Sequence, residues 1–157
     1  MAEIAPNFGA LVISLDFELR WGVRDRVPPD GGWYRQHLLG ARAAIPRMLD
    51  LFEEFGVAAT WATVGCLFAR SRAELDAFLP VTVPHYRDPH LLGYDDALGD
   101  GEDDDPLHYA PSLIEAIRHR PRQEIGSHTF GHYYCLEPGH DRASFRADLA
   151  SAVAIAR

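Results

Sequence analysis

The chain has 157 residues, of which 47% are hydrophobic and 24% are charged. This composition excludes disorder over the whole length, and the length predicts one soluble domain over residues 1–157. The formal net charge of −8 repels phosphate backbones, so we expect no nucleic-acid partner.

The cysteines and the apolar segments bear on the cellular compartment. Cys66 and Cys135 lie far apart without C-x-x-C spacing, which predicts free thiols and neither a zinc knuckle nor a disulfide framework. Residues 1–7 lack the basic region and apolar stretch of a signal peptide. The longest nearly apolar run, 57–69, is too short to span a bilayer. We therefore expect a cytoplasmic protein without a membrane span.

The first half of the chain has the pattern strand, loop, helix, strand. Residues 10–15 form a branched apolar run, which predicts a strand buried on both faces, and the proline- and glycine-rich segment 25–33 predicts a loop. Apolar residues recur at helical spacing over 41–55. Pro46 suits a first turn, so this helix is expected to begin near Ala44 or to kink. Residues 57–64 then predict a second buried strand, which completes a βαβ unit.

The second half begins with a long segment that has no periodicity. We interpret 80–106 as a loop whose acidic run, 100–105, is exposed to solvent and is not a metal site. Residues 111–118 predict a helix, 123–126 a short strand, and 143–157 a last helix. The alternation of strands and helices predicts an α/β fold with a parallel sheet, either open or closed into a barrel.

Two histidines follow the third predicted strand at a spacing suited to metal binding. His128 and His132 are four residues apart, and one helical turn between them would point both imidazoles the same way. The other six histidines have no partner at such a spacing, and we expect them at the surface or in loops.

Two carboxylates follow the first predicted strand, where their burial is costly without a partner or a metal. Asp16 and Glu18 are two residues apart and share a face of an extended chain, at the strand end where parallel α/β folds keep their active sites. Pairing with Arg20 or Arg24 is the competing interpretation. A carboxylate with two histidines indicates a hydrolytic zinc, cobalt or nickel site, or a non-haem iron oxygenase.

These segments resemble the motifs of the polysaccharide deacetylases of the NodB homology type, carbohydrate esterase family 4. Residues 14–18, Ser-Leu-Asp-Phe-Glu, are similar to the first motif, Thr-Phe-Asp-Asp-Gly. Residues 128–132, His-Thr-Phe-Gly-His, match the second motif, His-Ser/Thr-x-x-His, in full. Residues 59–65 resemble the strand between the two motifs, and 16–25 resemble the Asp-Phe-Glu-Leu-x-Trp-Gly-Val-Arg-Asp signature of a bacterial subgroup.

The resemblance implies a distorted (β/α) barrel, of which this chain is the N-terminal part with parallel strands. It implies a metal-dependent hydrolase that removes N-acetyl groups from amino sugars of a polysaccharide or its precursor. By position, Asp16 is the general base, and a divalent transition metal, zinc in the first place, is bound by Glu18, His128 and His132. Thr129 supports the loop. Three aromatic residues near the first loop either stack on a sugar ring or pack beneath the loop: Trp21, Trp33 and Tyr34.

The match departs from the family pattern in two places. The first motif has Asp-x-Glu in place of adjacent aspartates, so the alternative function is a metal-independent hydrolase of cyclic amides or ureides with the same fold. The family's later motifs have no counterpart before Arg157, and we therefore expect the isolated chain to be inactive. A non-catalytic partial domain is the third hypothesis. Uncovered strand edges predict low stability and association, either with a second copy or with a missing C-terminal half.

Overall fold

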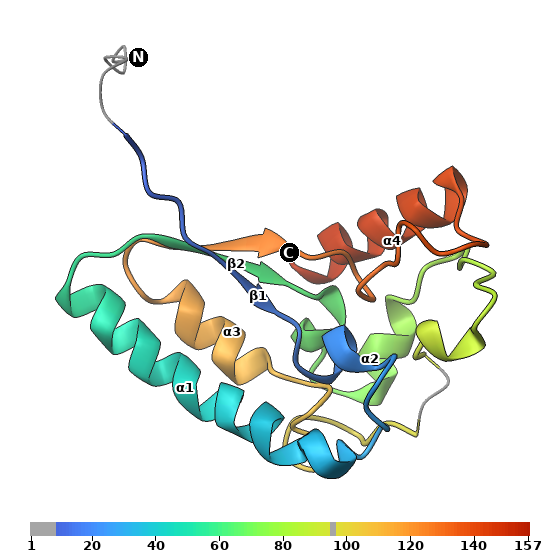
Figure 1. Cartoon of the computed structure of the whole chain (residues 1–157), viewed down its shortest axis with the longest axis horizontal. Coiled ribbons are helices and arrows are strands. Elements are labelled where there is room, and N and C mark those ends of the chain that lie inside the picture. Colours follow the sequence, from blue (N-terminus) through green and yellow to red (C-terminus); the bar gives the residue numbers. More distant parts are fainter. Residues whose placement is uncertain (1–8, 95–96) are drawn as a thin grey trace.

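The computed structural model describes residues 9–94 and 97–157 (Figure 1). The strands and α-helices are β1 (Ser14–Phe17), α1 (Arg35–Glu54), β2 (Ala59–Thr63), α2 (Arg72–Ala77), α3 (Pro111–Arg118), β3 (Gln123–Ser127) and α4 (Arg142–Ile155). Short 3-10 helices are η1 (Leu19–Val23), η2 (Gly32–Tyr34), η3 (Gly65–Phe68) and η4 (Pro89–Leu91). In the described ranges, no helix combines the length and apolarity that a membrane span requires. The prediction that residues 1–7 do not form a signal peptide concerns a segment outside these ranges.

The strands form an open parallel sheet in the order β1-β2-β3, which confirms the predicted α/β class with a parallel sheet. Asp16 is level with Ala62, and Ala62 is level with Gly126, so the three strands end at the same height. Residues that follow β1 and β3 therefore leave the sheet at the same end. The order of the elements thus brings Glu18 and His128 to one end of the sheet.

Helices α1 and α3 cover one face of this sheet (Figure 1). Phe52 of α1 lies against Trp61 of β2, with 6.3 Å between ring centroids, and Leu49 and Ile117 are buried in the same cluster. Burial of such apolar surface is the main stabilising contribution to the fold. Helix α4 packs beside η3, so the C-terminal helix approaches the strand ends.

The predicted helix at 41–55 begins earlier than expected. Helix α1 starts at Arg35, so the predicted start near Ala44 is wrong, and Pro46 lies inside the helix. Pro46 is exposed, and water can bind the carbonyl that its missing N–H leaves free. The other end is as expected, because Gly56 follows the helix with a φ of 62°, which favours glycine.

The first strand differs from its prediction in bounds and in burial. β1 covers Ser14–Phe17 and not 10–15, and the side chains of Leu11 and Val12 are 88% and 79% exposed. The prediction of burial on both faces is therefore wrong. β1 is the first strand of the sheet order, and of the residues just before it Ile13 accepts a hydrogen bond from the Thr60 N–H, whereas Leu11 and Val12 remain exposed. An apolar pattern records a preference for burial, whereas actual burial depends on a neighbouring element.

The acidic run at 100–105 is partly structural. Glu102 accepts hydrogen bonds from Arg42 and from Ser112, and Asp105 accepts from His108 Nδ1 at 2.9 Å. The interpretation as an exposed loop holds for Asp103 but is wrong for Glu102 and Asp105, which are half-buried. His108 lies in a loop, as one of the two expectations for it had it, but it is buried and not at the surface. Both carboxylates can be half-buried because each accepts hydrogen bonds from its own donors.

The remaining elements agree well with the sequence. α3 and β3 lie where they are predicted, and α4 begins within one residue of its predicted start. Its buried side chains, however, are Ser144, Asp148 and Ala152, whereas the apolar Val153 is half exposed. These three positions are four residues apart and form one helical face. The buried face of α4 therefore carries a carboxylate, which hydrophobic periodicity does not reveal.

Candidate metal centre

Glu18 follows β1 directly and precedes η1. Its backbone has left the extended conformation, with φ −136° and ψ −20°, so the chain turns at this residue. The carboxyl group folds back over η1, where Gly22 has no side chain to obstruct it: a Cβ at Gly22 would lie 2.0 Å from Glu18 Cδ. The competing pairing of Glu18 with Arg24 is not formed, because Arg24 donates instead to main-chain carbonyls.

The two histidines lie on a loop that continues β3. The N–H of His128 donates to Thr63 O at 2.9 Å, and the chain then leaves the sheet. Thr129 and His132 have φ values of 64° and 53°, which lie in the left-handed region. The expected helical turn between the histidines is therefore wrong. The imidazoles nevertheless converge, with ring centroids 5.1 Å apart.

The loop rests on the backbone of η3. Gly65 N–H donates to Thr129 O and Cys66 N–H donates to Phe130 O, each at 2.9 Å. A Cβ at Gly65 would lie 2.9 Å from Phe130 Cα, so this close approach requires glycine. Thr129 Oγ1 donates to His128 O and accepts from the Tyr133 N–H at 2.7 Å. These contacts agree with the supporting position expected for Thr129.

Two buried charged residues also hold the loop, of which sequence analysis named Arg24 only as a possible partner of the carboxylates and did not single out Asp148. Asp148 of α4 accepts the N–H groups of Phe130 at 2.7 Å and Gly131 at 3.1 Å. Arg24 donates to His132 O at 3.1 Å and to Leu91 O at 2.7 Å. The available signal was weak: Asp148 is an acidic residue on an otherwise mostly apolar helix, and Arg24 belongs to the signature at 16–25.

Glu18, His128 and His132 form a group whose donor atoms suit a metal ion. Oε2 of Glu18 lies 3.2 Å from Nε2 of His128 and 3.2 Å from Nε2 of His132. One ligand atom from each residue lies within 4.8 Å of the other two. Two ligands about 2.1 Å from a tetrahedral ion are about 3.4 Å apart, so this spacing fits zinc. Nδ1 of His132 is buried, which leaves Nε2 as the nitrogen that faces the site.

Glu18 and His128 have shifted pKa values. Hydrogen bonds with His128, first, and with His132 lower the pKa of Glu18 to about 2. The hydrogen bond with Glu18 raises the pKa of His128 above its usual value. Glu18 is therefore ionised at neutral pH, which is the form that binds a cation. A carboxylate and an imidazole with shifted pKa values are typical of functional sites.

Asp16 lies next to this group but outside it. Its Oδ1 is 4.0 Å from Nδ1 of His128, and its side chain is 61% exposed. A pocket of about 370 Å³ lies between β1 and α1, and Asp16 and Glu18 line it together with apolar side chains such as Leu38 and Ile45. A molecule in this pocket would thus contact both carboxylates.

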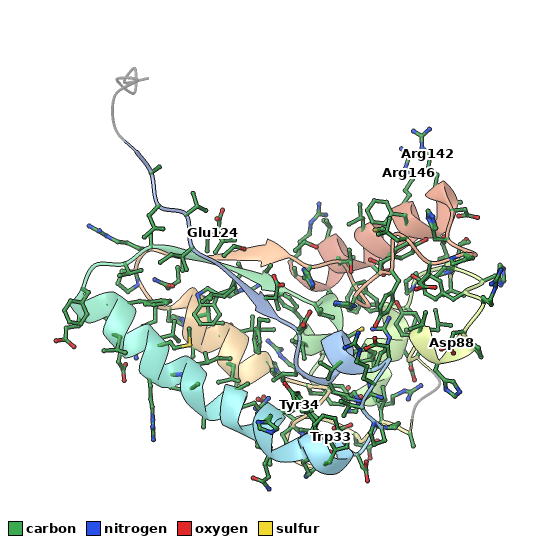
Figure 2. The ribbon with its side chains drawn as sticks, viewed as in Figure 1. Trp33, Tyr34, Asp88, Glu124, Arg142 and Arg146 are labelled. Carbon is green, nitrogen blue, oxygen red and sulfur yellow. The ribbon has the colours of Figure 1, made fainter. Side chains whose placement is uncertain are left out.

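The aromatic residues of the first loop divide into two kinds. Trp21 is buried in the core, and its indole N–H donates to His108 O at 2.9 Å, so packing beneath the loop is its role. Trp33 is 75% exposed and lies beside Tyr34 near the start of α1 (Figure 2). Of the two tryptophans, only Trp33 has a ring surface open to a sugar.

No family model, no curated protein and no solved structure matches this chain.

Proposed function

We propose that this chain binds a divalent transition metal, zinc in the first place, through Glu18, His128 and His132. The observation that carries the proposal is the convergence of one carboxylate and two imidazole nitrogens at the strand ends, with Oε2 of Glu18 3.2 Å from Nε2 of each histidine. One carboxylate and two histidines leave a coordination position open, which is the pattern of catalytic zinc sites.

We propose further that the centre serves hydrolysis of the N-acetyl group of an amino sugar in a polysaccharide or its precursor. The motif resemblance to the polysaccharide deacetylases supports this substrate, and the sheet β1-β2-β3 would be the N-terminal part of their distorted (β/α) barrel. The exposed Trp33 offers a stacking surface for a sugar ring.

The residues around the site take defined roles in such a reaction. A bound metal supplies Lewis-acid polarisation of the acetyl carbonyl and acidifies a water molecule. Asp16 is exposed and adjacent to His128, so its carboxylate accepts the proton of the attacking water as general base. Glu18 and the two histidines hold their donor atoms in place and take no proton in this step.

The alternative is a metal-independent hydrolase of cyclic amides or ureides. It is favoured by the same 3.2 Å distances, which also allow hydrogen bonds from both imidazoles to Glu18 without any ion. Activity that survives strong chelators would support this alternative. A non-catalytic partial domain, the third hypothesis, predicts metal binding without deacetylation by the 157 residues.

Metal analysis of the purified chain tests the proposal directly. We expect about one equivalent of zinc in the unmutated protein. His128→Ala should hold almost none, because only two of the three protein ligands remain. His119→Ala is the matched control, since His119 is exposed and lies four residues before β3, at the end of the parallel sheet opposite to Glu18. An unmutated protein that takes up no transition metal from a zinc-containing medium contradicts the metal site.

A further inference from the structure

The loop of residues 128–132 contains two strained backbone positions. Thr129 and His132 adopt left-handed φ values, which cost free energy in residues that have a Cβ, above all in a β-branched one. Such a backbone persists only where the surrounding contacts enforce it. The contacts on this loop therefore decide where its two imidazoles point.

Asp148 supplies two of these contacts from α4. One carboxylate oxygen accepts the N–H of Phe130 and the other accepts the N–H of Gly131, so both oxygens bind the middle of the loop. The residue is 2% exposed. Hydrogen bonds to an ionised group are about twice as strong as neutral ones, and burial from water keeps them from exchanging with solvent.

The stability of α4 does not account for a carboxylate at this position. The helix has its own N-terminal cap, in which Asp141 accepts the Ser144 N–H at 2.7 Å. Burial raises the pKa of Asp148 although both amides favour its charged form, so an apolar side chain would be the less costly occupant of the position. The hydrogen bonds to Phe130 and Gly131 lead out of the helix and into the histidine loop.

We propose that Asp148 is a positioning residue, which locks residues 128–132 in the conformation that turns both imidazoles toward Glu18. Its effect on metal binding rests on the proposed function, whereas its effect on the loop does not. Helix α4 is then part of the site although it contributes no ligand. Residues that orient metal ligands typically change metal affinity about ten- to a hundredfold when they are replaced.

The test compares Asp148→Asn with Asp141→Ala in the full chain. Asp148→Asn keeps the size of the side chain but points an amide NH₂ at one of the two backbone N–H groups. Asp141→Ala removes the cap of the same helix and touches no residue of the loop. Four quantities are measured: Co²⁺ affinity, the visible spectrum of bound Co²⁺, Tm, and the amide NMR signals of Phe130 and Gly131 in metal-free protein.

We expect Asp148→Asn to bind Co²⁺ about ten- to a hundredfold more weakly, with an altered visible spectrum. Its Phe130 and Gly131 amide protons should shift upfield as the charged acceptor is lost. Asp141→Ala should lower Tm and leave affinity and spectrum unchanged. If Asp148→Asn does not fold, the smaller Asp148→Ser, which keeps one acceptor, is measured in the same way.

The outcomes separate the two proposals. Asp148 variants with unmutated affinity, spectrum and amide signals overturn the positioning role, while Co²⁺ binding by the unmutated chain still supports the proposed function. If the unmutated chain binds no Co²⁺, the proposed function fails, and the amide signals alone decide the loop: unchanged signals overturn the role of Asp148, and shifted signals support it.

Discussion

Gly22 leaves the space that the carboxyl group of Glu18 occupies. A Cβ at position 22 would lie 2.0 Å from Cδ and 2.1 Å from Oε1 of Glu18, closer than any real contact. Helix η1 brings Gly22 back beneath the side chain of Glu18. The carboxyl group of Glu18 can therefore reach the imidazoles only because residue 22 has no side chain. The segment from Asp16 to Asp25 therefore acts as one unit, which carries both the ligand and the room for it.

Replacement of Gly22 by alanine should displace Glu18 and weaken metal binding. The end of the Glu18 side chain is flexible, so the clash is relieved by rotation of this side chain and the fold is retained. We expect zinc affinity to fall about tenfold or more, because one of three ligands leaves its position. Titration with zinc against a fluorescent chelator measures this change.

Gly40→Ala is the control for the Gly22 substitution. Gly40 lies in α1 with open space around its Cα, so alanine should stabilise the helix by about 0.5–1 kcal/mol and leave zinc affinity unchanged. Equal zinc affinities of Gly22→Ala and the unmutated chain would show that Glu18 is not a ligand in this position.

Replacement of Arg24 by lysine should loosen the loop from its other end. Arg24 is buried and its guanidinium donates to three carbonyls, those of Trp21, Leu91 and His132, at 2.9, 2.7 and 3.1 Å. A lysine ammonium cannot reproduce this planar fork, so buried carbonyls lose their donors. We expect Arg24→Lys to destabilise the fold by about 2–4 kcal/mol and to weaken zinc binding.

Urea unfolding, followed by circular dichroism, measures the stability of the Arg24 variant. Arg146→Lys is its control, because Arg146 projects from α4 into solvent (Figure 2). The control should lie within about 0.5 kcal/mol of the unmutated chain. A loss for Arg24→Lys no larger than that of the control would mean that the three carbonyls find other donors.

Asp105 should make the free energy of unfolding decrease as the pH becomes acidic. Burial raises the pKa of Asp105, but hydrogen bonds from His108 and from the Gly99 N–H outweigh it, and the pKa lies below its usual value. A carboxyl group with a lowered folded pKa contributes stability above its unfolded pKa, about 3.9, and loses this stability as the pH falls through the folded pKa.

Comparison of unfolding free energies with Asp105→Asn over a pH series tests this dependence. The unmutated chain should be more stable than the variant by about 1–3 kcal/mol at neutral pH, and the difference should shrink below about pH 4. Asp103→Asn, at an exposed position of the same loop, is the control and should change the stability at neutral pH by less than about 0.5 kcal/mol. A difference for Asp105→Asn that is the same at every pH would assign its effect to packing.

The residues before β1 should promote self-association. Leu11 and Val12 are exposed, and β1 is an edge strand of the described sheet, so apolar surface and unpaired main-chain groups lie together. The double variant Leu11→Asn, Val12→Thr should lower the weight-average mass in sedimentation equilibrium. Val81→Thr, at another exposed apolar position, is the control. Equal masses of all three proteins would exclude this edge as the contact.

The local pattern of the chain determined the elements and much of the candidate site. Periodicity and flanking residues predicted α3 and β3 closely, because apolar faces, prolines and glycines act through neighbours in sequence. The positions after two parallel strands predicted that Glu18 and His128 would meet, since parallel strands end on one side of a sheet.

Tertiary structure alone decided what covers each element and what holds the site. Leu11 is apolar but exposed, because in the described ranges no helix or strand packs over its side chain. Asp148 is charged but buried, because it binds a loop sixteen to twenty residues away. The two histidines converge through left-handed backbone at Thr129 and His132, which no helical spacing predicts. Burial and backbone strain are set by contacts between distant segments, and a sequence pattern records only local preference.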